Sequence, residues 1–512
     1  MRKENLAAGF SRRTVLIGGT VLAATSAIGG TSAHAAAPVA VTDKGVVRGS
    51  TEDGLTIWRG IRYAAPPIGP NRWRPPRPLA SWQGVRDAIT FGPACLQPIA
   101  RNEPERSLKD MPQSEDCLTL NVWAPQGGND LPVMVWIHGG SFRFGAGSLE
   151  LYHGVRLARR GVVVVTINYR LGLFGTFSHP ALREQGEEDV NFGLLDQIAA
   201  LEWVRDNIAS FGGNPANVTL SGESAGGVSV SYLMTSPLAR GLFHRAIVQS
   251  GGLAVPLHGR PQADAIGHRL SADLGLPAAS AQDLRALPAT ALRDAPYTAA
   301  DIMPKRDNRL IHRPLAEAFA EGEGGDIPLM IGWNTAEAGF FGRRYWESIQ
   351  EDLGPELFGH LKALCTGWGK DSDDAAAEQI ASEWFAGSVS RRMALLHRGP
   401  VHAYRFGWVP QAERATSLGA IHTAEIPYVF GHVAVAATAD AESRAVSNSL
   451  AARWAAFVSN GEPQEPDALG WSRQSGDGSA FLLIGTDGVK IGPDPCAALD
   501  EAILNEALPP RP

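Results

Sequence analysis

The chain has 512 residues, of which 44% are hydrophobic and 19% are charged, and its formal net charge is −7. This composition is typical of folded globular proteins and excludes extensive disorder. The net negative charge argues against a protein dedicated to nucleic acids, because binding phosphates requires a basic surface.

The first 35 residues have the pattern of an export signal. Basic residues, including the pair Arg12-Arg13, precede a mildly apolar stretch that ends near Ile28, and Ala33-His34-Ala35 forms a small-residue cleavage site. Paired arginines before a moderately hydrophobic stretch favour the twin-arginine route. We therefore expect a signal peptide over residues 1–35 and a secreted or periplasmic mature domain over residues 36–512. No stable membrane anchor is expected after cleavage.

The chain has four cysteines, Cys95, Cys117, Cys365 and Cys496. An even number in an exported chain suggests disulfide bonds. Cys95 and Cys117 are close in sequence and form the predicted pair, and the alternative is that they are buried thiols. For Cys365 and Cys496 both states stay open. The chain contains no Cys-x-x-Cys pattern, which argues against a structural zinc site.

Continuous apolar runs rich in β-branched residues indicate buried strands. Runs without polar alternation are typical of strands that are covered on both faces, as in a parallel sheet. The runs lie at residues 133–137, 162–167, 218–220, 246–248 and 329–331.

Helical patterns lie among these strands and after them. Apolar residues recur every three or four positions over residues 198–208 and 446–458. The alternation predicts an α/β fold with a mostly parallel central sheet and helices on both faces. Residues 256–325 and 340–400 also have helical patterns, and we interpret them as helical insertions over the sheet that shape a pocket.

The motif Gly222-Glu223-Ser224-Ala225-Gly226 lies between the strand at 218–220 and an apolar helix candidate at 227–234. A G-x-S-x-G match alone is weak, and its alternative is an ordinary turn. The strand-turn-helix setting is what a nucleophile elbow needs, because the glycines let the strand and the helix approach around a serine with a strained backbone. We therefore expect Ser224 to be a nucleophile.

A second glycine-rich turn, His138-Gly139-Gly140-Ser141-Phe142, follows the strand at 133–137. Turns of the H-G-G-G type in this position donate backbone N–H groups to the oxyanion that forms when a serine attacks a carbonyl carbon. Ser141 replaces the third glycine but keeps its N–H group. The backbone N–H groups of Gly140, Ser141 and Ala225 are the predicted oxyanion hole, and a plain turn after a strand is the alternative.

These motifs resemble those of the type-B carboxylesterases, the α/β-hydrolase family that includes cholinesterases and bacterial para-nitrobenzyl esterases. Residues 211–221 resemble the family's serine signature, and residues 115–123 resemble its second signature. Residues 168–172 and 196–201 match further family blocks. The resemblance covers essentially the whole mature chain, and it implies the α/β-hydrolase fold and ester hydrolysis.

The resemblance also supplies the two partners of Ser224. Residues 334–340 resemble the block whose glutamate orients the catalytic histidine, and Glu337 is the matching residue, although Ala336 replaces the usual aspartate. Residues 419–431 resemble the catalytic-histidine block, with His422 as the base. The order Ser224, Glu337, His422 is the order expected for this fold.

In the implied reaction His422 accepts the proton of Ser224, Glu337 holds the imidazole, and an acyl-enzyme forms on Ser224. Glu223 and Glu425 match family positions near the site, where we expect them to act as supporting acids. No metal or organic cofactor is needed, and the expected partner is a small-molecule ester.

Two alternatives to a secreted carboxylesterase share its fold. A lipase or polyester-type hydrolase would use the same triad but needs an apolar lid, and residues 256–325 are not strongly apolar. A non-catalytic binding protein of the neuroligin type would lack the serine. Choline esters are disfavoured as substrates, because the segment between Cys95 and Cys117 has no aromatic residue to bind a quaternary ammonium.

Overall fold

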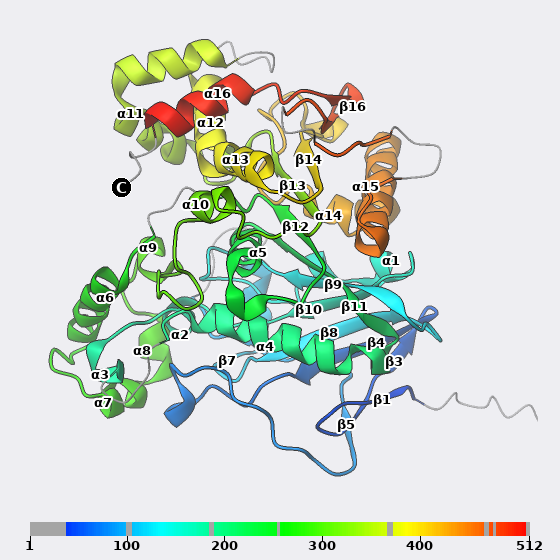
Figure 1. Ribbon diagram of the computed structural model, residues 1–512, viewed down its shortest axis with the longest axis vertical. Coiled ribbons are helices and arrows are strands. Elements are labelled where there is room, and N and C mark those ends of the chain that lie inside the picture. Colours follow the sequence, from blue (N-terminus) through cyan, green and yellow to red (C-terminus); the bar gives the residue numbers. More distant parts are fainter. Residues whose placement is uncertain are drawn as a thin grey trace, which may run out of the picture. The chain divides into compact units, whose positions relative to one another are not determined.

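A mixed sheet of eleven strands forms the centre of residues 37–512 (Figure 1). Seven neighbouring strands are parallel, and the antiparallel pairs lie toward the two edges. In spatial order the strands are β16 (Gly488–Gly492), β15 (Phe481–Gly485), β14 (Val401–Phe406), β13 (Leu329–Asn334), β12 (Arg245–Gln249), β11 (Gly213–Glu223), β9 (Leu131–Ile137), β10 (Val163–Ile167), β8 (Thr119–Pro125), β4 (Leu55–Arg62) and β3 (Ser50–Glu52).

The computed structural model describes residues 37–98, 105–183, 189–252, 257–365, 372–464, 470–474 and 478–507. The predicted signal peptide lies outside these residues. In the part of the chain that is described, no helix combines the length and apolar character needed to cross a membrane.

All five strands predicted from apolar runs are present, as β9, β10, β11, β12 and β13. The two predicted helices are also present, as α4 (Phe192–Asn207) and α15 (Ala441–Asn460). Two smaller sheets were not predicted. One consists of β1 (Val39–Val41), β2 (Val46–Arg48) and β5 (Val85–Asp87), and the other of β6 (Ala94–Cys95) and β7 (Gln113–Ser114).

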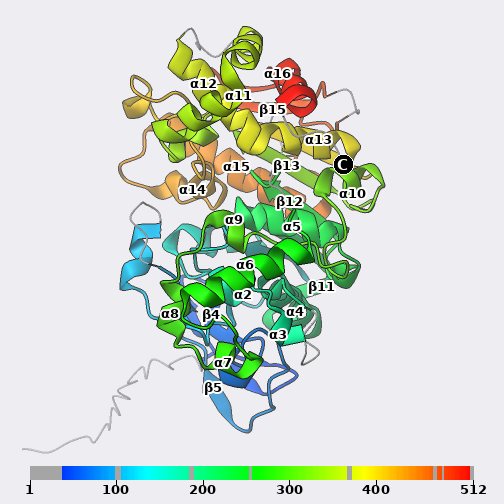
Figure 2. The same cartoon turned by 90° about the vertical axis from the view of Figure 1, so that its left-hand side faces the viewer.

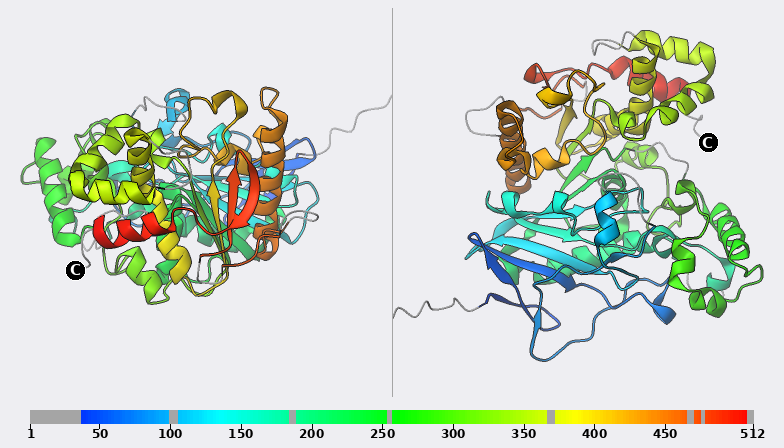
Figure 3. Two further views of the ribbon diagram at one scale, coloured as in Figure 1. Left: turned by 90° about the horizontal axis from the view of Figure 1, so that it is seen from above. Right: turned by 180° about the vertical axis from the view of Figure 1, so that it is seen from behind.

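Alternate side chains of each central strand enter different cores, which explains the continuous apolar runs. In β9, Val133 and Val135 belong to a core shared with α4 and α5 (Ala225–Thr235), whereas Met134 and Trp136 belong to a second core shared with α15. In Figure 1 α4 lies in front of the sheet, and in the rear view of Figure 3 α15 is in full view. Helices therefore cover both faces of the sheet, as predicted.

The two predicted insertions are helical. The first, described from residue 257, contains α6 (Arg260–Asp273), α7 (Ala281–Ala286), α8 (Ala289–Arg293), α9 (Ala299–Ile302) and α10 (Leu315–Ala320). The second contains α11 (Arg343–Leu364), α12 (Asp373–Ser382), the π-helix η7 (Glu383–Gly387) and α13 (Ser388–Leu396). Figure 2 shows α6 to α9 separated from α11 and α12.

Short helices complete the described part of the fold. They are α1 (Val155–Ala158), α2 (Gly172–Gly175), α3 (Pro180–Arg183), α14 (Ile426–Val429) and α16 (Ala497–Ala502).

Candidate active site

Ser224 lies at the sharp turn between β11 and α5. Its backbone has φ 54° and ψ −124°, and its N–H group donates a hydrogen bond to the Gln249 carbonyl at 2.9 Å. A Cβ atom on Gly226 would lie 2.0 Å from the Ile137 carbonyl oxygen, and one on Gly222 would lie 2.5 Å from the backbone of Gly226. Only glycine fits at these two positions, so the motif forms the tight elbow that its sequence predicts.

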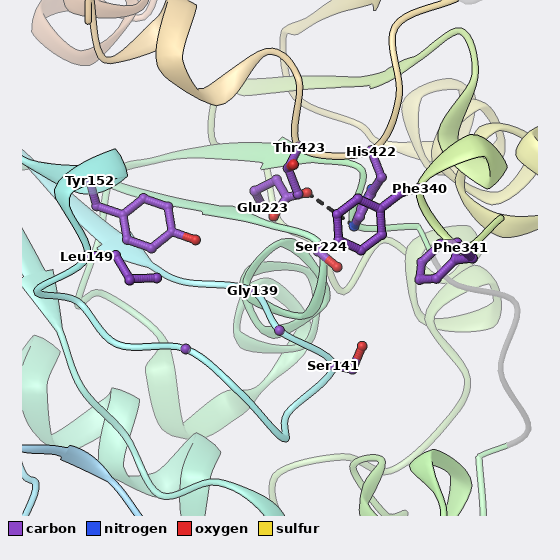
Figure 4. Close-up of a pocket in the computed structure, with 12 residues that line it drawn as sticks. Gly139, Ser141, Leu149, Tyr152, Glu223, Ser224, Phe340, Phe341, His422 and Thr423 are labelled. Carbon is purple, nitrogen blue, oxygen red and sulfur yellow. Dashed lines mark ion pairs between the residues drawn. The ribbon is translucent and has the colours of Figure 1, made fainter. Parts of the chain in front are cut away.

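Glu337 and His422 come from different loops and meet in one ion pair. Glu337 begins the 3₁₀ helix η6 (Glu337–Phe340) after β13, and His422 lies just before α14. Glu337 Oε2 lies 2.6 Å from His422 Nδ1 (Figure 4 shows His422 above Ser224). The Ala336 N–H group donates to the Ala420 carbonyl at 2.9 Å, so a backbone contact holds the two loops together.

The second carboxylate oxygen of Glu337 is held by two donors that the sequence analysis did not identify. The Ser250 hydroxyl donates to Glu337 Oε1 at 2.6 Å, and the Asn334 N–H group donates to the same oxygen at 2.7 Å. Ser250 directly follows β12, and its place at the carboxyl end of a parallel strand is the signal that could have identified it. These bonds fix the orientation of the carboxylate before any ligand enters.

The second nitrogen of the imidazole, Nε2, contacts Glu223. His422 Nε2 lies 3.2 Å from Glu223 Oε1, and both side chains are buried. Among the described residues, no hydrogen bond joins Ser224 Oγ to His422 Nε2 in this state. The predicted supporting acid Glu223 thus lies against Nε2, the imidazole nitrogen that does not contact Glu337.

Two buried carboxylates determine the charge of His422. Burial alone lowers the pKa of the imidazole, but the negative charges of Glu223 and Glu337 outweigh it and raise the pKa to about 9. Protonation is therefore the favoured state of His422 near neutral pH.

Glu425 is also buried and lies one hydrogen bond from the same network. Its carboxylate accepts hydrogen bonds from the Gln249 amide at 2.8 Å and from the Asn334 amide at 2.7 Å. Burial and the charge of Glu337 raise the pKa of Glu425. Because Asn334 also donates its backbone N–H group to Glu337, Asn334 links Glu425 to Glu337.

The predicted oxyanion donors lie on the loop after β9 and at the start of α5. Gly140 has φ 102°, and a Cβ atom there would lie 2.3 Å from the Phe144 carbonyl oxygen. The Gly140 carbonyl accepts hydrogen bonds from the N–H groups of Arg143 and Phe144. In the described part of the chain no acceptor engages the Gly140 or Ser141 N–H group, and Ala225 is the first residue of its helix.

Gln97 holds the far end of this loop and was not identified from the sequence. Its amide donates to the Gly145 carbonyl at 2.9 Å and accepts from the Gly145 N–H group at 2.8 Å. The same amide nitrogen donates to the Cys95 carbonyl at 2.9 Å, and the side chain is 1% exposed. No local sequence pattern marks such a residue, because Gly145 lies 48 residues farther along the chain.

A pocket opens between these groups (Figure 4). Aromatic side chains flank the histidine: Phe340 and Phe341 line the pocket, and the ring of Phe385 in η7 lies 5.1 Å from the imidazole. Among the described residues of the two insertions, only those of the second contribute to the lining. The full lining is Gly139, Gly140, Ser141, Gly145, Leu149, Tyr152, Glu223, Ser224, Phe340, Phe341, His422 and Thr423.

Comparisons with known proteins place this arrangement in a family. Residues 36–495 match the sequence profile of the carboxylesterase family. The chain belongs to the carboxylesterase family. The resemblance to para-nitrobenzyl esterases is thereby confirmed, and the protein hydrolyses carboxylic esters.

Two curated esterases and one solved structure illustrate the relationship. The para-nitrobenzyl esterase of Bacillus subtilis (strain 168) is 37% identical over 89% of this chain and 96% of its own length. The fumonisin B1 esterase of Sphingopyxis macrogoltabida is 35% identical over 91% of both chains. The carboxylesterase structure from Geobacillus stearothermophilus superimposes with a TM-score of 0.78 at 32% identity, covering 91% of this chain and 99% of that one. The fold of this carboxylesterase is the α/β-hydrolase fold.

The prediction of a disulfide bond between Cys95 and Cys117 is wrong. Both residues are buried thiols, and the Leu171 N–H group donates to Cys95 Sγ at 3.3 Å. A hydrogen bond to Cys95 and burial raise the pKa of Cys117 well above its usual value. A chain of this size buries enough apolar surface to fold without a covalent cross-link. Cys365 and Cys496 are also thiols.

No metal site was expected from the sequence. In the described ranges, no group of three or more His, Cys, Asp and Glu side chains is arranged to hold a metal ion.

The charge of Glu223 has a measurable consequence for this esterase. A histidine that acts as a base must be neutral to accept a proton, so with His422 in its predicted role we expect kcat/KM to rise with pH toward the His422 pKa of about 9. Glu223→Gln removes a negative charge 3.2 Å from Nε2, which destabilises the imidazolium and moves this rise to lower pH. Ester hydrolysis measured between pH 5 and 10 tests the shift. Glu202→Gln, at an exposed acid on α4, is the control and should leave the profile in place.

Proposed function

We propose that this carboxylesterase acts through an acyl-enzyme on Ser224, with His422 as general base and Glu337 as the acid that orients it. The observation that carries the proposal is the 2.6 Å contact of Glu337 with His422 Nδ1 in the pocket that Ser224 lines. This contact places the Nδ1 proton on the side of Glu337 and leaves Nε2 to exchange protons with the serine and the leaving group.

In acylation, Ser224 Oγ forms a bond to the carbonyl carbon while its proton moves to His422 Nε2. The carbon–oxygen bond to the alcohol then breaks, and His422 returns the proton to the departing alkoxide. Water repeats the sequence: it loses a proton to Nε2, attacks the acyl carbon, and releases the acid as Ser224 regains its proton. Glu223 stabilises the imidazolium each time Nε2 is protonated.

The N–H groups of Gly140, Ser141 and Ala225 are proposed to bind the oxyanion of both tetrahedral intermediates. They are backbone donors held by a tight turn and a helix start, so they need no rearrangement when charge develops on the carbonyl oxygen. Loss of one such donor costs about 3–4 kcal/mol of transition-state stabilisation in related serine hydrolases.

The acyl-enzyme can be tested by covalent labelling. A fluorophosphonate should add to one residue, Ser224, and peptide mass spectrometry locates the adduct. Hydrolysis of para-nitrophenyl esters from acetate to octanoate, followed with and without the label, should stop in proportion to labelling. A modified residue other than Ser224, or full turnover by the labelled protein, would contradict the proposal.

We also propose that the protein is exported by the twin-arginine route and cleaved after Ala35. The proposal rests on the basic residues, the mildly apolar stretch and the Ala33-His34-Ala35 site. In a bacterial host with this pathway, we expect the full-length gene product to appear outside the cytoplasm with a mature N-terminus at Ala36. Intact mass and N-terminal sequencing measure this. Replacing Arg12-Arg13 by two lysines should retain the precursor inside the cell, and unchanged export of that variant would refute the route.

A further inference from the structure

Ser141 occupies a backbone conformation that favours glycine. Its φ is 56°, and the next residue, Phe142, has the same value. A non-glycine residue in this left-handed region is strained, and such strain concentrates at functional sites. The loop therefore carries a side chain at a position where glycine would be adopted more easily.

The Ser141 side chain faces the reacting groups. Ser141 lines the pocket together with Ser224 and His422, and in Figure 4 its hydroxyl points toward the Ser224 hydroxyl. Within the part of the chain that is described, no protein group forms a hydrogen bond with Ser141 Oγ. The hydroxyl is therefore available to a ligand, unlike the Ser250 hydroxyl, which donates to Glu337.

The position of the Ser141 hydroxyl indicates which ligand atom can accept its hydrogen bond. Ser141 already presents its backbone N–H group to the proposed oxyanion hole, and Oγ is attached to the same Cα atom. An oxygen atom that accepts from the N–H group lies within reach of the hydroxyl of the same residue. Negative charge develops on that oxygen only as Ser224 attacks, so a donor there stabilises the transition state more than the bound ester.

We propose that the Ser141 hydroxyl donates a hydrogen bond to the oxyanion and acts as a side-chain donor beside the three backbone donors. The inference rests on the acyl-enzyme mechanism at Ser224 and assigns a further catalytic residue within it. The hydroxyl keeps its proton throughout, because it donates a hydrogen bond and forms no covalent bond. Its effect is to hold the negative charge until the carbonyl re-forms.

The test compares Ser141→Ala, Ser141→Gly and wild-type enzyme on para-nitrophenyl acetate and butyrate. Both variants should lose about 10- to 100-fold in kcat with KM nearly unchanged, since the lost interaction forms only in the transition state. A trifluoromethyl ketone forms a charged tetrahedral adduct with the serine, and its Ki should rise by the same factor. Ser141→Gly should melt no lower than wild type, because glycine relieves the strain at φ 56°.

The control is Ser148→Ala, a buried serine of the same loop that does not line the pocket. It should keep wild-type kcat and trifluoromethyl ketone affinity. Two results would overturn the proposal: wild-type kcat in Ser141→Ala, or a fall in kcat with unchanged ketone affinity. Failure of fluorophosphonate to label Ser224 in the wild-type enzyme would instead contradict the acyl-enzyme mechanism itself.

Discussion

Replacement of Ser224 by alanine is expected to lower kcat for ester hydrolysis by about 10⁶-fold, the scale seen when a catalytic serine is removed from a hydrolase triad. The variant keeps the backbone that forms the elbow but has no oxygen to attack the ester. The remaining rate would come from the oxyanion donors acting on attack by water. Stopped-flow and long-time assays with para-nitrophenyl butyrate cover the required range.

The fold of the Ser224→Ala variant needs separate measurement, because Ser224 has φ 54° and is 7% exposed. Alanine retains the same backbone strain and fills nearly the same volume, so the melting temperature should stay close to wild type. Ser210→Ala, at an exposed serine before β11, serves as a control for handling and should remain fully active. A folded Ser224→Ala variant that retains more than about 1% of kcat would mean that another nucleophile acts.

The sheet could be predicted from local patterns only where its strands are uniformly apolar. β14 was missed because it contains His402 and Arg405, although every residue of the strand is buried. Arg405 is tolerated there because Glu383 and Asp494 accept hydrogen bonds from its guanidinium. These acids lie in η7 and after β16, so no window along the sequence reveals the compensation.

The residues of the candidate site differ in the kind of sequence information that is needed to predict them. Ser224 is marked by a local motif because the elbow imposes glycine at fixed positions around it. Glu337 and His422 required the family pattern, since a single acid and a single histidine leave no local signature. The contact between Glu223 and His422 Nε2 depends on how side chains from two loops are oriented, and this orientation cannot be predicted from the sequence.

Residues with a strained backbone cluster around the candidate active site. Among the described residues, nine non-glycine positions have positive φ, and five of them surround the site: Ser141, Phe142, Ser224, Ser250 and Thr423. Each lies next to, or carries, a group that the proposed mechanism uses. The surrounding contacts must hold these strained residues in place, and the clamp of Gln97 on Gly145 and the bonds of Ser250 to Glu337 are two such contacts.

Replacement of Glu337 by glutamine is expected to lower kcat by about 10³- to 10⁴-fold through the wrong histidine tautomer. Ser250 and the Asn334 N–H group both donate to Oε1, so the amide oxygen of a glutamine would take that place. The NH₂ group would then face His422 Nδ1 and require it to accept. The proton would move to Nε2, which could no longer accept the proton of Ser224.

The pH dependence and a companion variant identify this cause. Loss of the Glu337 charge also lowers the His422 pKa, so Glu337→Gln should remain impaired at every pH between 6 and 10 while its profile moves to lower pH. Glu223→Gln removes a carboxylate on the Nε2 side without reversing the tautomer and should lose less activity than Glu337→Gln. If Glu337→Gln instead retains kcat within about tenfold of wild type and Glu223→Gln does not, the orienting acid is Glu223, because only one of the two carboxylates can determine which nitrogen accepts the serine proton.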